Sequence, residues 1–404
     1  MDSLFCIMIK RIASLAMAMI LSVAVWSQTD SLATTPPRKS HLRISLLTCG
    51  VGELVYEIFG HTAVRVVDSN VEGPLRDIVY NYGMFNGYDD NFEMKFMRGK
   101  LPYYVATNLF EDFMMEYNEL GRRVEEQVLN INDSAKESIN AFLQENVLPQ
   151  NRYYKYDFFF DNCATRIRDI FPAALGGAFK FGRILPDNST MTFRDIINKY
   201  FYRRHWERVG VNILLGSRID EVMTDRDIMF LPDYLRDGLA GATNDGNKVA
   251  DAPAIILQGN KPVEAGANIP LLLTSSLLLL TVAGVGIKRL NLLGRIMSVL
   301  LLAISGLLGA LILTMWFATD HQGCANNYNI LWAMPVNLVL AFAKPLKKDK
   351  YAVMAILMIV VSLLMHVLHV QGLVLELIPL MLALMTVHIN VYRKSKEAVR
   401  NATA

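Results

Sequence analysis

The chain has 404 residues, of which 52% are hydrophobic and 19% charged, and its formal net charge of +2 is close to neutral. A chain of this length suggests about two or three folded units. A near-neutral charge gives no electrostatic footprint for nucleic acid, so we expect no nucleic-acid partner. The 4 cysteines are too few and too scattered for a disulfide framework, and no CxxC pair predicts a zinc site or a redox motif.

The N-terminus is typical of an export signal, which we place at residues 1–28. Lys10 and Arg11 precede the apolar run IASLAMAMILSVAVW, and small residues follow near Ala24 and Ser27. An uncleaved N-terminal anchor is the alternative. In both cases the segment that follows would be translocated across the membrane.

Residues 29–240 have the pattern of a soluble domain that mixes strands and helices. The alternating runs HLRISLLTC, GHTAVRVVD and DIVYNYGMF predict strands. A capping box of Ser134 and Glu137 predicts a helix over residues 130–148. The spacing of apolar residues in CATRIRDIF predicts a second helix that begins at or near Cys163.

The composition changes twice towards the C-terminus. Residues 241–269 are rich in Gly, Ala, Asn and Pro, lack a helix or strand period, and predict a linker. Residues 270–404 predict a transmembrane domain with a short cytoplasmic tail. Five segments are apolar enough to cross a bilayer, namely 270–287, 296–317, 330–343, 352–370 and 373–391. The third is short and contains Pro335, so we expect it to be broken or re-entrant.

The loop charges predict an orientation. Lys and Arg residues follow the first, third and fifth spans, whereas the loops ATDHQGCANNYN and HVQG contain none. By the positive-inside rule, the 29–240 domain would be periplasmic and the C-terminus cytoplasmic, in an integral, multi-pass protein of the inner membrane. The export signal requires the same arrangement.

Cys163 has three interpretations: a small buried hydrophobe, half of a disulfide with Cys49, or a nucleophile. A helix N-terminus lowers the pKa of a thiol and favours the thiolate. A thiol nucleophile also needs a base, and His61 is the candidate because it shares one face of a predicted strand with Arg65. The residues alone leave the three interpretations open. A metal site that joins Cys163 to a histidine is a weaker interpretation, because no Cys or His pair within residues 29–240 has helical or knuckle spacing.

Several stretches together resemble a known family. LLTCGVGELVYEIFGHTAVRV, VYNYGMF, YKYDFFFDNCATRIRDI and FLPDYL resemble the periplasmic domain of the Lnb-type lipoprotein N-acylation proteins, and WFATDHQGCANNYNILWAMP resembles their transmembrane half. That domain is similar to circularly permuted papain-like thiol enzymes of the NlpC type, in which the His strand precedes the Cys helix. The resemblance implies an α+β permuted papain-like (NlpC-type) extracytoplasmic domain followed by an all-α bundle of about five transmembrane helices.

The resemblance also implies roles for individual residues. Carried over by position, Cys163 would be the nucleophile and His61 the base. Asn81 is the candidate that orients His61, and Tyr82 is its rival. Tyr156 could assist the backbone N–H groups near Cys163 in holding the oxyanion. The resemblance implies no cofactor and no metal.

Three further residues are candidates for binding substrate. Arg65 could bind a phosphate or carboxylate, and the alternative is a salt bridge within the fold, for instance to Asp161 or Asp169. His321 and Asn329 lie in the external loop that leads into the third span, where polar residues could contribute to a lipid-binding site. His321 could serve catalysis or bind a lipid headgroup, and capping of the loop is the alternative.

The implied activity is that of a membrane-bound acyltransferase. Cys163 would take a fatty acyl chain as a thioester from a membrane phospholipid or a diacylglyceryl lipoprotein. The chain would then pass to the N-terminal amine of a lipoprotein. A cell-envelope thiol hydrolase and a non-catalytic envelope scaffold are the alternatives.

Overall fold

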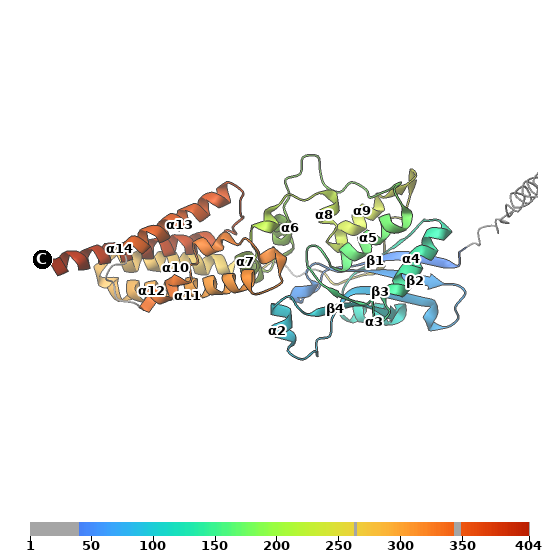
Figure 1. Ribbon diagram of the computed structural model, residues 1–404, viewed down its shortest axis with the longest axis horizontal. Helices are drawn as coiled ribbons and strands as arrows, with labels where there is room; N and C mark the ends of the chain where they lie inside the picture. Colours follow the sequence, from blue (N-terminus) through green and yellow to red (C-terminus); the bar gives the residue numbers. More distant parts are fainter. Residues whose placement is uncertain (1–39, 262–264, 343–348, 404) are drawn as a thin grey trace, which may run out of the picture. The chain divides into compact units, whose positions relative to one another are not determined.

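The computed structural model describes residues 40–261, 265–342 and 349–403 (Figure 1). The predicted signal segment, residues 1–28, lies outside the described residues. From His41 onward the chain belongs to one folded unit.

A seven-stranded sheet in the order β10-β5-β1-β2-β3-β4-β6 organises the N-terminal half, and every neighbouring pair in it is antiparallel. The three predicted strands are confirmed as the three central ones, β1, β2 and β3. The strands are β1 (Leu42–Cys49), β2 (His61–Asp68), β3 (Asp77–Met84), β4 (Pro102–Leu109), β5 (Val124–Val128), β6 (Tyr153–Lys155) and β10 (Ala254–Leu257).

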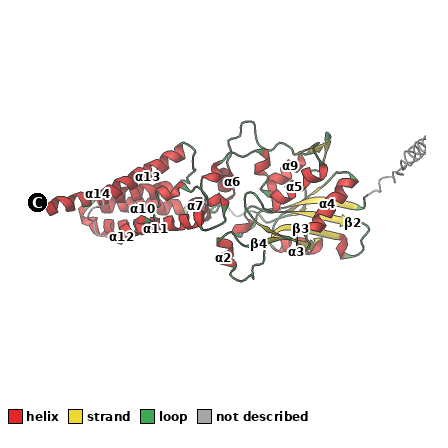
Figure 2. Ribbon diagram, in the orientation of Figure 1, coloured by secondary structure: helices red, strands yellow, loops and turns green. Residues whose placement is uncertain are grey.

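Helices cover both faces of this sheet (Figure 2). On one face lie α4 (Asp133–Asn146), α5 (Cys163–Leu175) and α9 (Pro232–Ala240), and on the other lies α3 (Phe110–Glu119). The alternation along β2 explains this division, because Val64 and Val66 pack towards α5 whereas Ala63 packs towards α3.

Helix α5 begins at Cys163, as the sequence predicts. Asn162 is its N-cap, and its side chain accepts a hydrogen bond of 2.9 Å from the Thr165 N–H. The Thr165 hydroxyl in turn accepts from the Asn162 N–H at 2.8 Å, which completes a capping box. Ile167 and Ile170 anchor the helix in the core. This cap therefore fixes Cys163 as the first residue of a rigid helix.

Helix α4 is also present, but its predicted cap is wrong. The helix begins at Asp133, and the Asn132 side chain accepts from the Ala135 N–H at 2.8 Å. Ser134 thus lies inside the first turn. The sequence here offers three adjacent residues that can cap a helix, and the local propensities do not choose among them.

The segment expected to be a linker, residues 241–269, carries regular structure. It contains β8 (Thr243–Asn244), which pairs with β7 (Phe179–Lys180), and β9 (Asn247–Lys248), which pairs with β8, so that the three strands form a small sheet. It also contains β10, which pairs with β5 at the edge of the main sheet. The folded sheet domain therefore extends beyond residue 240, to Leu257 at least.

Four short helices lie in the connections between strands. These are α2 (Phe92–Met97), α6 (Phe193–Tyr200), α7 (His205–Leu214) and α8 (Asp225–Ile228). Phe159, Phe193 and Phe230 form an aromatic cluster beside α6. This cluster adjoins the site described below.

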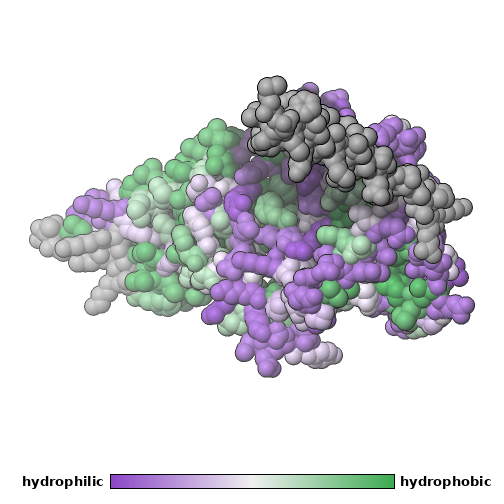
Figure 3. Space-filling view, turned by 45° about the vertical axis from the view of Figure 1, so that its right-hand side comes forward, coloured by the Kyte–Doolittle hydropathy of each residue, from purple (hydrophilic) through white to green (hydrophobic). Residues whose placement is uncertain are grey.

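The C-terminal region is helical and strongly apolar. On the face seen in Figure 3, hydrophobic residues gather over the helices at the left, and hydrophilic residues dominate the middle of the view. The helices are α10 (Ile269–Gly286), α11 (Asn291–Phe317), α12 (Val336–Phe342), α13 (Asp349–Val367) and α14 (Leu377–Thr403).

Three stretches of the described residues are long and apolar enough to cross a membrane: Ile269–Gly286, Lys288–Phe317 and Asp349–Val367. The third expected span is broken into a 3-10 turn at Tyr328–Leu331 and the short helix α12. Pro335 stands at this break, where its missing N–H prevents a continuous helix. The C-terminal half of α14 is polar, and this helix is not among the candidate membrane spans. The expected number of five spans is therefore not confirmed.

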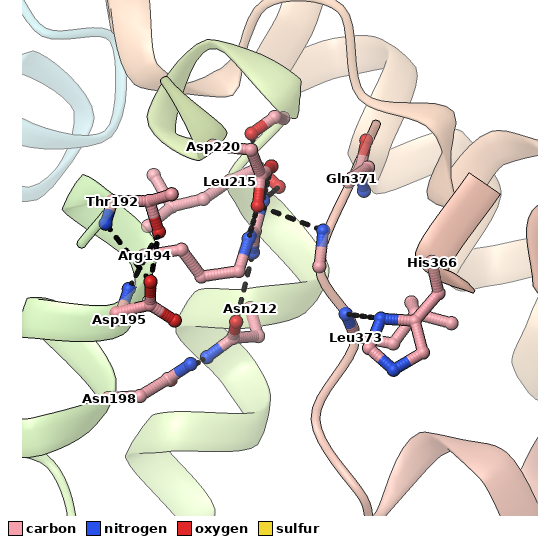
Figure 4. Close-up of polar contacts among 12 residues, drawn as sticks. Thr192, Arg194, Asp195, Asn198, Asn212, Leu215, Asp220, His366, Gln371 and Leu373 are labelled. Carbon is pink, nitrogen blue, oxygen red and sulfur yellow. Dashed lines mark hydrogen bonds and ion pairs between the residues drawn. The ribbon is translucent and has the colours of Figure 1, made fainter. Parts of the chain in front are cut away.

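A buried polar cluster ties the region around α6 and α7 to the loop between α13 and α14 (Figure 4). Arg194 is 3% exposed and donates to Asp220 Oδ1 and Oδ2 at 2.8 and 2.9 Å and to Asn212 Oδ1 at 2.9 Å. Asp220 also accepts from the Gly372 N–H at 2.9 Å. Each charge in this cluster is paired, which burial of an ion pair requires.

Candidate active site

Cys163 and His61 line one cavity of about 290 Å³, which we call the thiol cavity. Cys163 enters it from the first turn of α5, and His61 enters it from the first residue of β2. Other residues that line the thiol cavity include Glu57, Tyr82, Arg122 and Tyr156. The structure therefore brings the predicted nucleophile and the predicted base to the same place.

His61 is oriented by a chain of side-chain amides. Its Nε2 lies 3.1 Å from Asn81 Oδ1, and Asn81 Nδ2 donates to Asn108 Oδ1 at 2.9 Å. Asn81 is 3% exposed, so its position is fixed by packing as well. A carbonyl oxygen only accepts, so Nε2 carries the proton and Nδ1 keeps its lone pair. His61 is thus held in the tautomer whose Nδ1 can accept a proton.

Burial keeps both groups of the pair neutral. Burial lowers the pKa of His61 from 6.5 to about 4, although the hydrogen bond to Asn81 acts in the opposite direction. Burial raises the pKa of Cys163 to about 11, although the N–H groups of Thr62, Ala164 and Cys163 itself lower it. At neutral pH the pair is therefore a thiol beside a neutral imidazole, which suits general-base activation by His61.

The disulfide interpretation of Cys163 is not supported. Cys49, Cys163 and Cys324 are free thiols. Cys49 is fully buried opposite His61 in the β1–β2 ladder, and burial raises the pKa of its thiol to about 12. Cys49 therefore behaves as a core residue.

Two tyrosines border the thiol cavity. Tyr82 is 1% exposed, and its hydroxyl has no hydrogen-bond partner among the described residues. Tyr82 lies on the α5 side of β3, whereas Asn81 lies on the His61 side, so Asn81 and not Tyr82 orients His61. Tyr156 stacks on Tyr103 with ring centroids 4.1 Å apart, and burial raises the pKa of its hydroxyl. Tyr156 therefore stays protonated and can donate a hydrogen bond.

Arg65 forms salt bridges within the fold, as one of its two expected uses, but with other partners than Asp161 and Asp169. Its guanidinium donates to Asp77 Oδ1 at 2.8 Å and to Glu126 Oε1 at 3.0 Å, and it stacks over the Phe110 ring. Asp77 is the first residue of the neighbouring strand β3, and Glu126 lies on β5. Only the order of strands in the sheet brings these two carboxylates to Arg65. Arg65 lines none of the cavities described here.

The two acidic residues named as alternative partners of Arg65 pair elsewhere. Asp161 binds Arg166 at 2.6 Å, and Asp169 binds Arg168 and Arg226, both at 2.7 Å. The guanidinium of Arg65 is thus committed to the fold through other carboxylates, and nothing suggests that it contacts substrate.

His321 belongs to a second cavity of about 510 Å³, which we call the apolar cavity. Aromatic and aliphatic side chains form most of its lining, among them Phe92, Phe96, Phe159, Val211 and Leu215. The His321 Nε2–H donates to the Phe96 carbonyl at 3.1 Å. His321 therefore fixes the loop after α11 to helix α2, at the wall of the apolar cavity.

Gly99 allows that loop to approach. Its φ of +66° favours glycine, and a Cβ atom there would meet Asp320 and His321 at 3.3 Å. The Asp320 N–H donates to the Arg98 carbonyl at 2.9 Å, and Asp320 pairs with Lys155 at 3.0 Å. The turn after α2 and the loop after α11 therefore form one wall.

Asn329 has a structural role in place of the expected contact with substrate. It is fully buried and donates to the carbonyls of Asn212 and Ile213 at 3.0 and 3.1 Å. Its Oδ1 accepts from Trp332 at 3.0 Å. These bonds satisfy carbonyls at the C-terminal end of α7, which a helix cannot satisfy internally.

Arg122 also lines the thiol cavity, although no pattern in the sequence predicts it there. Arg122 is 6% exposed and pairs with Glu57 at 3.2 Å, another lining residue. No local pattern separates Arg122 from its neighbour Arg123, whose side chain is 43% exposed. Within residues 40–261, 265–342 and 349–403, no group of three or more His, Cys, Asp or Glu side chains could hold a metal ion.

Two family models match the chain. One is described as the Lnb N-terminal periplasmic domain and matches residues 33–199, and the other is described as the Lnb transmembrane domain and matches residues 264–398. None of the curated proteins or solved structures matches, so the permuted papain-like relation stays a prediction. Together the two models cover most of the chain, which therefore belongs to the Lnb family of membrane-associated, lipoprotein-modifying proteins.

Proposed function

We propose that this protein is a thiol-dependent acyltransferase that moves a fatty acyl chain through Cys163 to the N-terminal amine of bacterial lipoproteins. Its partners are then membrane phospholipids and diacylglyceryl lipoproteins. One observation carries the proposal: the thiol cavity, with Cys163 and the oriented His61, adjoins a larger apolar cavity beside the end of a candidate membrane span.

The first half-reaction forms a thioester. His61 Nδ1 takes the Cys163 thiol proton while the sulfur attacks the ester carbonyl of the acyl donor. Backbone N–H groups at the start of α5, with the Tyr156 hydroxyl, stabilise the oxyanion. The ester C–O bond then breaks, and the leaving alcohol takes the proton back from His61.

The second half-reaction forms an amide. The neutral N-terminal amine of a lipoprotein attacks the thioester carbonyl, and His61 accepts a proton from the amine. The C–S bond breaks, and the thiolate of Cys163 takes that proton from the imidazolium. The free enzyme is restored without a cofactor.

The apolar cavity supplies a site for the acyl chain. It shares six lining residues with the thiol cavity, so the two cavities adjoin along a common wall: Tyr56, Phe59, Phe85, Tyr103, Tyr156 and Phe158. Each methylene buried there stabilises the bound chain by about 0.8 kcal/mol. A fatty acyl ester would thus lie with its carbonyl near Cys163 and its tail in the apolar cavity.

The same cavity points to delivery from a membrane. Residues 320–324 line it and follow directly on the candidate span that ends at Phe317. Exposed apolar side chains surround it on the 3-10 turn η1 (Val55–Glu57) and on α2, including Tyr56, Phe96 and Met97. Such a cluster is typical of a membrane contact. We infer an inner-membrane protein with a periplasmic catalytic domain and a cytoplasmic C-terminus.

The test is the intact mass of native lipoproteins from cells that carry the wild-type protein, Cys163→Ser or Cys49→Ser. The proposal predicts that only Cys163→Ser removes the N-terminal acyl group. If lipoproteins stay unchanged in Cys163→Ser cells while cell-wall peptides change, the thiol serves a hydrolase. If neither changes, the thiol is not a nucleophile.

A further inference from the structure

Arg122 has a donor that the fold does not use. Its Nε donates to the Gly50 carbonyl at 3.0 Å, and its Nη1 lies 3.2 Å from Glu57 Oε1. Its Nη2 is buried and has no hydrogen-bond partner among the described residues. A buried donor without a partner costs about 1–3 kcal/mol, and more when the group is charged. Such a donor at the wall of a cavity is typical of a site that a ligand completes.

Arg122 lies at the junction of two cavities. It lines the thiol cavity, and it also lines a larger groove of about 1070 Å³, which we call the basic groove. Six basic residues line the basic groove: Arg122, Lys199, Arg203, Arg204, Arg236 and Lys261. An anionic group that reaches the thiol cavity from this side would therefore pass a cationic surface.

The carboxylates around this junction are mostly engaged. Glu57 is paired with Nη1 of Arg122 itself. In the basic groove, Asp233 accepts from the Tyr200 hydroxyl at 3.0 Å and Asp237 pairs with Arg236 at 2.8 Å. The other lining carboxylates, Glu53 and Glu116, are exposed to solvent, which screens them. The buried Nη2 of Arg122 thus remains available to an anion.

We infer that Arg122 binds the phosphate of the acyl donor through Nη2, so that the donor is a glycerophospholipid. The phosphate then lies at the junction, the headgroup extends into the basic groove, and the acyl tail occupies the apolar cavity. A diacylglyceryl lipoprotein carries no phosphate beside its ester bonds, and it would leave Nη2 unpaired. This inference rests on the proposed function and names the donor for the first half-reaction.

A different role for Arg122 makes a different prediction. Its positive charge also favours the thiolate form of Cys163. If Arg122 acted only through the effect of its charge on Cys163, its loss would slow thioester formation from every ester. If it binds phosphate as well, its loss slows the reaction of esters that carry phosphate far more than the reaction of esters without it.

The experiment uses the full-length protein in detergent micelles and follows thioester formation on Cys163 by intact mass. The two donors are dipalmitoyl phosphatidylethanolamine and dipalmitoylglycerol, which share their ester bonds and differ in the phosphate headgroup. The variants are Arg122→Gln, Arg122→Lys and, as a matched control, Arg123→Gln. Arg123 is half exposed, pairs with Glu125, and lines neither the thiol cavity nor the basic groove.

We expect Arg122→Gln to slow the phospholipid reaction by about tenfold or more, the range of a lost hydrogen bond to a charged group. We expect it to leave the dipalmitoylglycerol reaction within about twofold of the wild-type rate. Arg122→Lys retains the charge without the planar fork and should slow the phospholipid reaction selectively as well. Arg122→Lys therefore still tests the inference if Arg122→Gln does not fold. Arg123→Gln should behave as wild type with both donors.

Equal losses with the two donors, or no loss with either, would overturn the inference and leave the acyltransferase itself intact. Faster reaction of dipalmitoylglycerol when inorganic phosphate is added would also overturn it, because the site would then serve a free anion. If the wild-type protein forms no thioester with any donor, the proposed function fails, and the inference fails with it.

Discussion

Replacing Asn81 with Asp tests the assignment of His61 as a neutral base. The substitution places a carboxylate where His61 Nε2 now meets an amide oxygen at 3.1 Å. In the wild-type protein, burial lowers the pKa of His61 to about 4, so the imidazole is neutral and ready to accept a proton above that pH. A carboxylate at this distance favours the imidazolium and raises the pKa of His61.

The expected size of the effect follows from this geometry. An opposite charge within hydrogen-bond distance raises the pKa of a histidine by about 1–3. The base must be unprotonated, so activity is present above the pKa of His61 and is lost as pH falls through it. The acid limb of the rate profile should therefore move from near pH 4 in the wild type to about pH 5–7 in Asn81→Asp.

The assay is the pH dependence of kcat/KM for thioester formation from a soluble acyl ester. Asn81→Ala is the control, because it removes the acceptor without adding charge. It should slow the reaction by about two- to tenfold, the value of one buried hydrogen bond, and should not move the acid limb upward. An acid limb in Asn81→Asp that stays in place or moves to lower pH would refute the role of His61.

Three further predictions concern the thiol, the fold and the acyl chain. Cys49→Ser should keep thioester formation, whereas Cys163→Ser should abolish it; the reverse pattern in intact-mass spectra would exchange the two assignments. Arg194→Leu leaves the buried Asp220 carboxylate without a cationic partner, with only the Gly372 N–H still donating to it, and should lower the free energy of unfolding by about 3–5 kcal/mol in denaturant titrations. The control is Arg183→Leu, because Arg183 forms an exposed ion pair with Asp187; its free energy of unfolding should stay within about 1 kcal/mol of the wild-type value. Equal losses of stability in the two variants would contradict the importance of the buried pair. Leu215→Trp narrows the apolar cavity and should shift the preference towards shorter acyl esters, by about fourfold in rate for each methylene excluded. An unchanged dependence of the rate on chain length would show that the acyl chain does not bind in this cavity.

The parts of the fold that the sequence predicts are those set by short-range periodicity. The alternation in GHTAVRVVD predicts strand β2 and its two faces, and the apolar spacing in CATRIRDIF predicts a helix that starts at or near Cys163. The juxtaposition of His61 and Cys163 is different. It arises from a helix packed on an antiparallel sheet across about a hundred residues of chain, which only the family resemblance suggests.

The parts that the sequence does not predict depend on the register of distant segments. Arg122 and Arg123 are neighbours in GRRVEEQ, yet one is buried at the thiol cavity and the other is half exposed, because β5 pairs with β1 in one particular register. The partners of Arg65 are set in the same way by the order of strands in the sheet. Strand β10 escaped prediction because its four apolar residues lie within a segment dominated by Gly, Asn and Pro.

The most direct test of the account is to search for an acyl group on Cys163. The full-length protein would be incubated with phospholipid and no lipoprotein, then denatured and analysed by intact mass and by peptide mapping. The account predicts one fatty acyl increment on the peptide that contains Cys163, released by hydroxylamine and lost in Cys163→Ser. Phospholipid turnover without an acyl group on Cys163, or an acyl group carried by another residue, would contradict it.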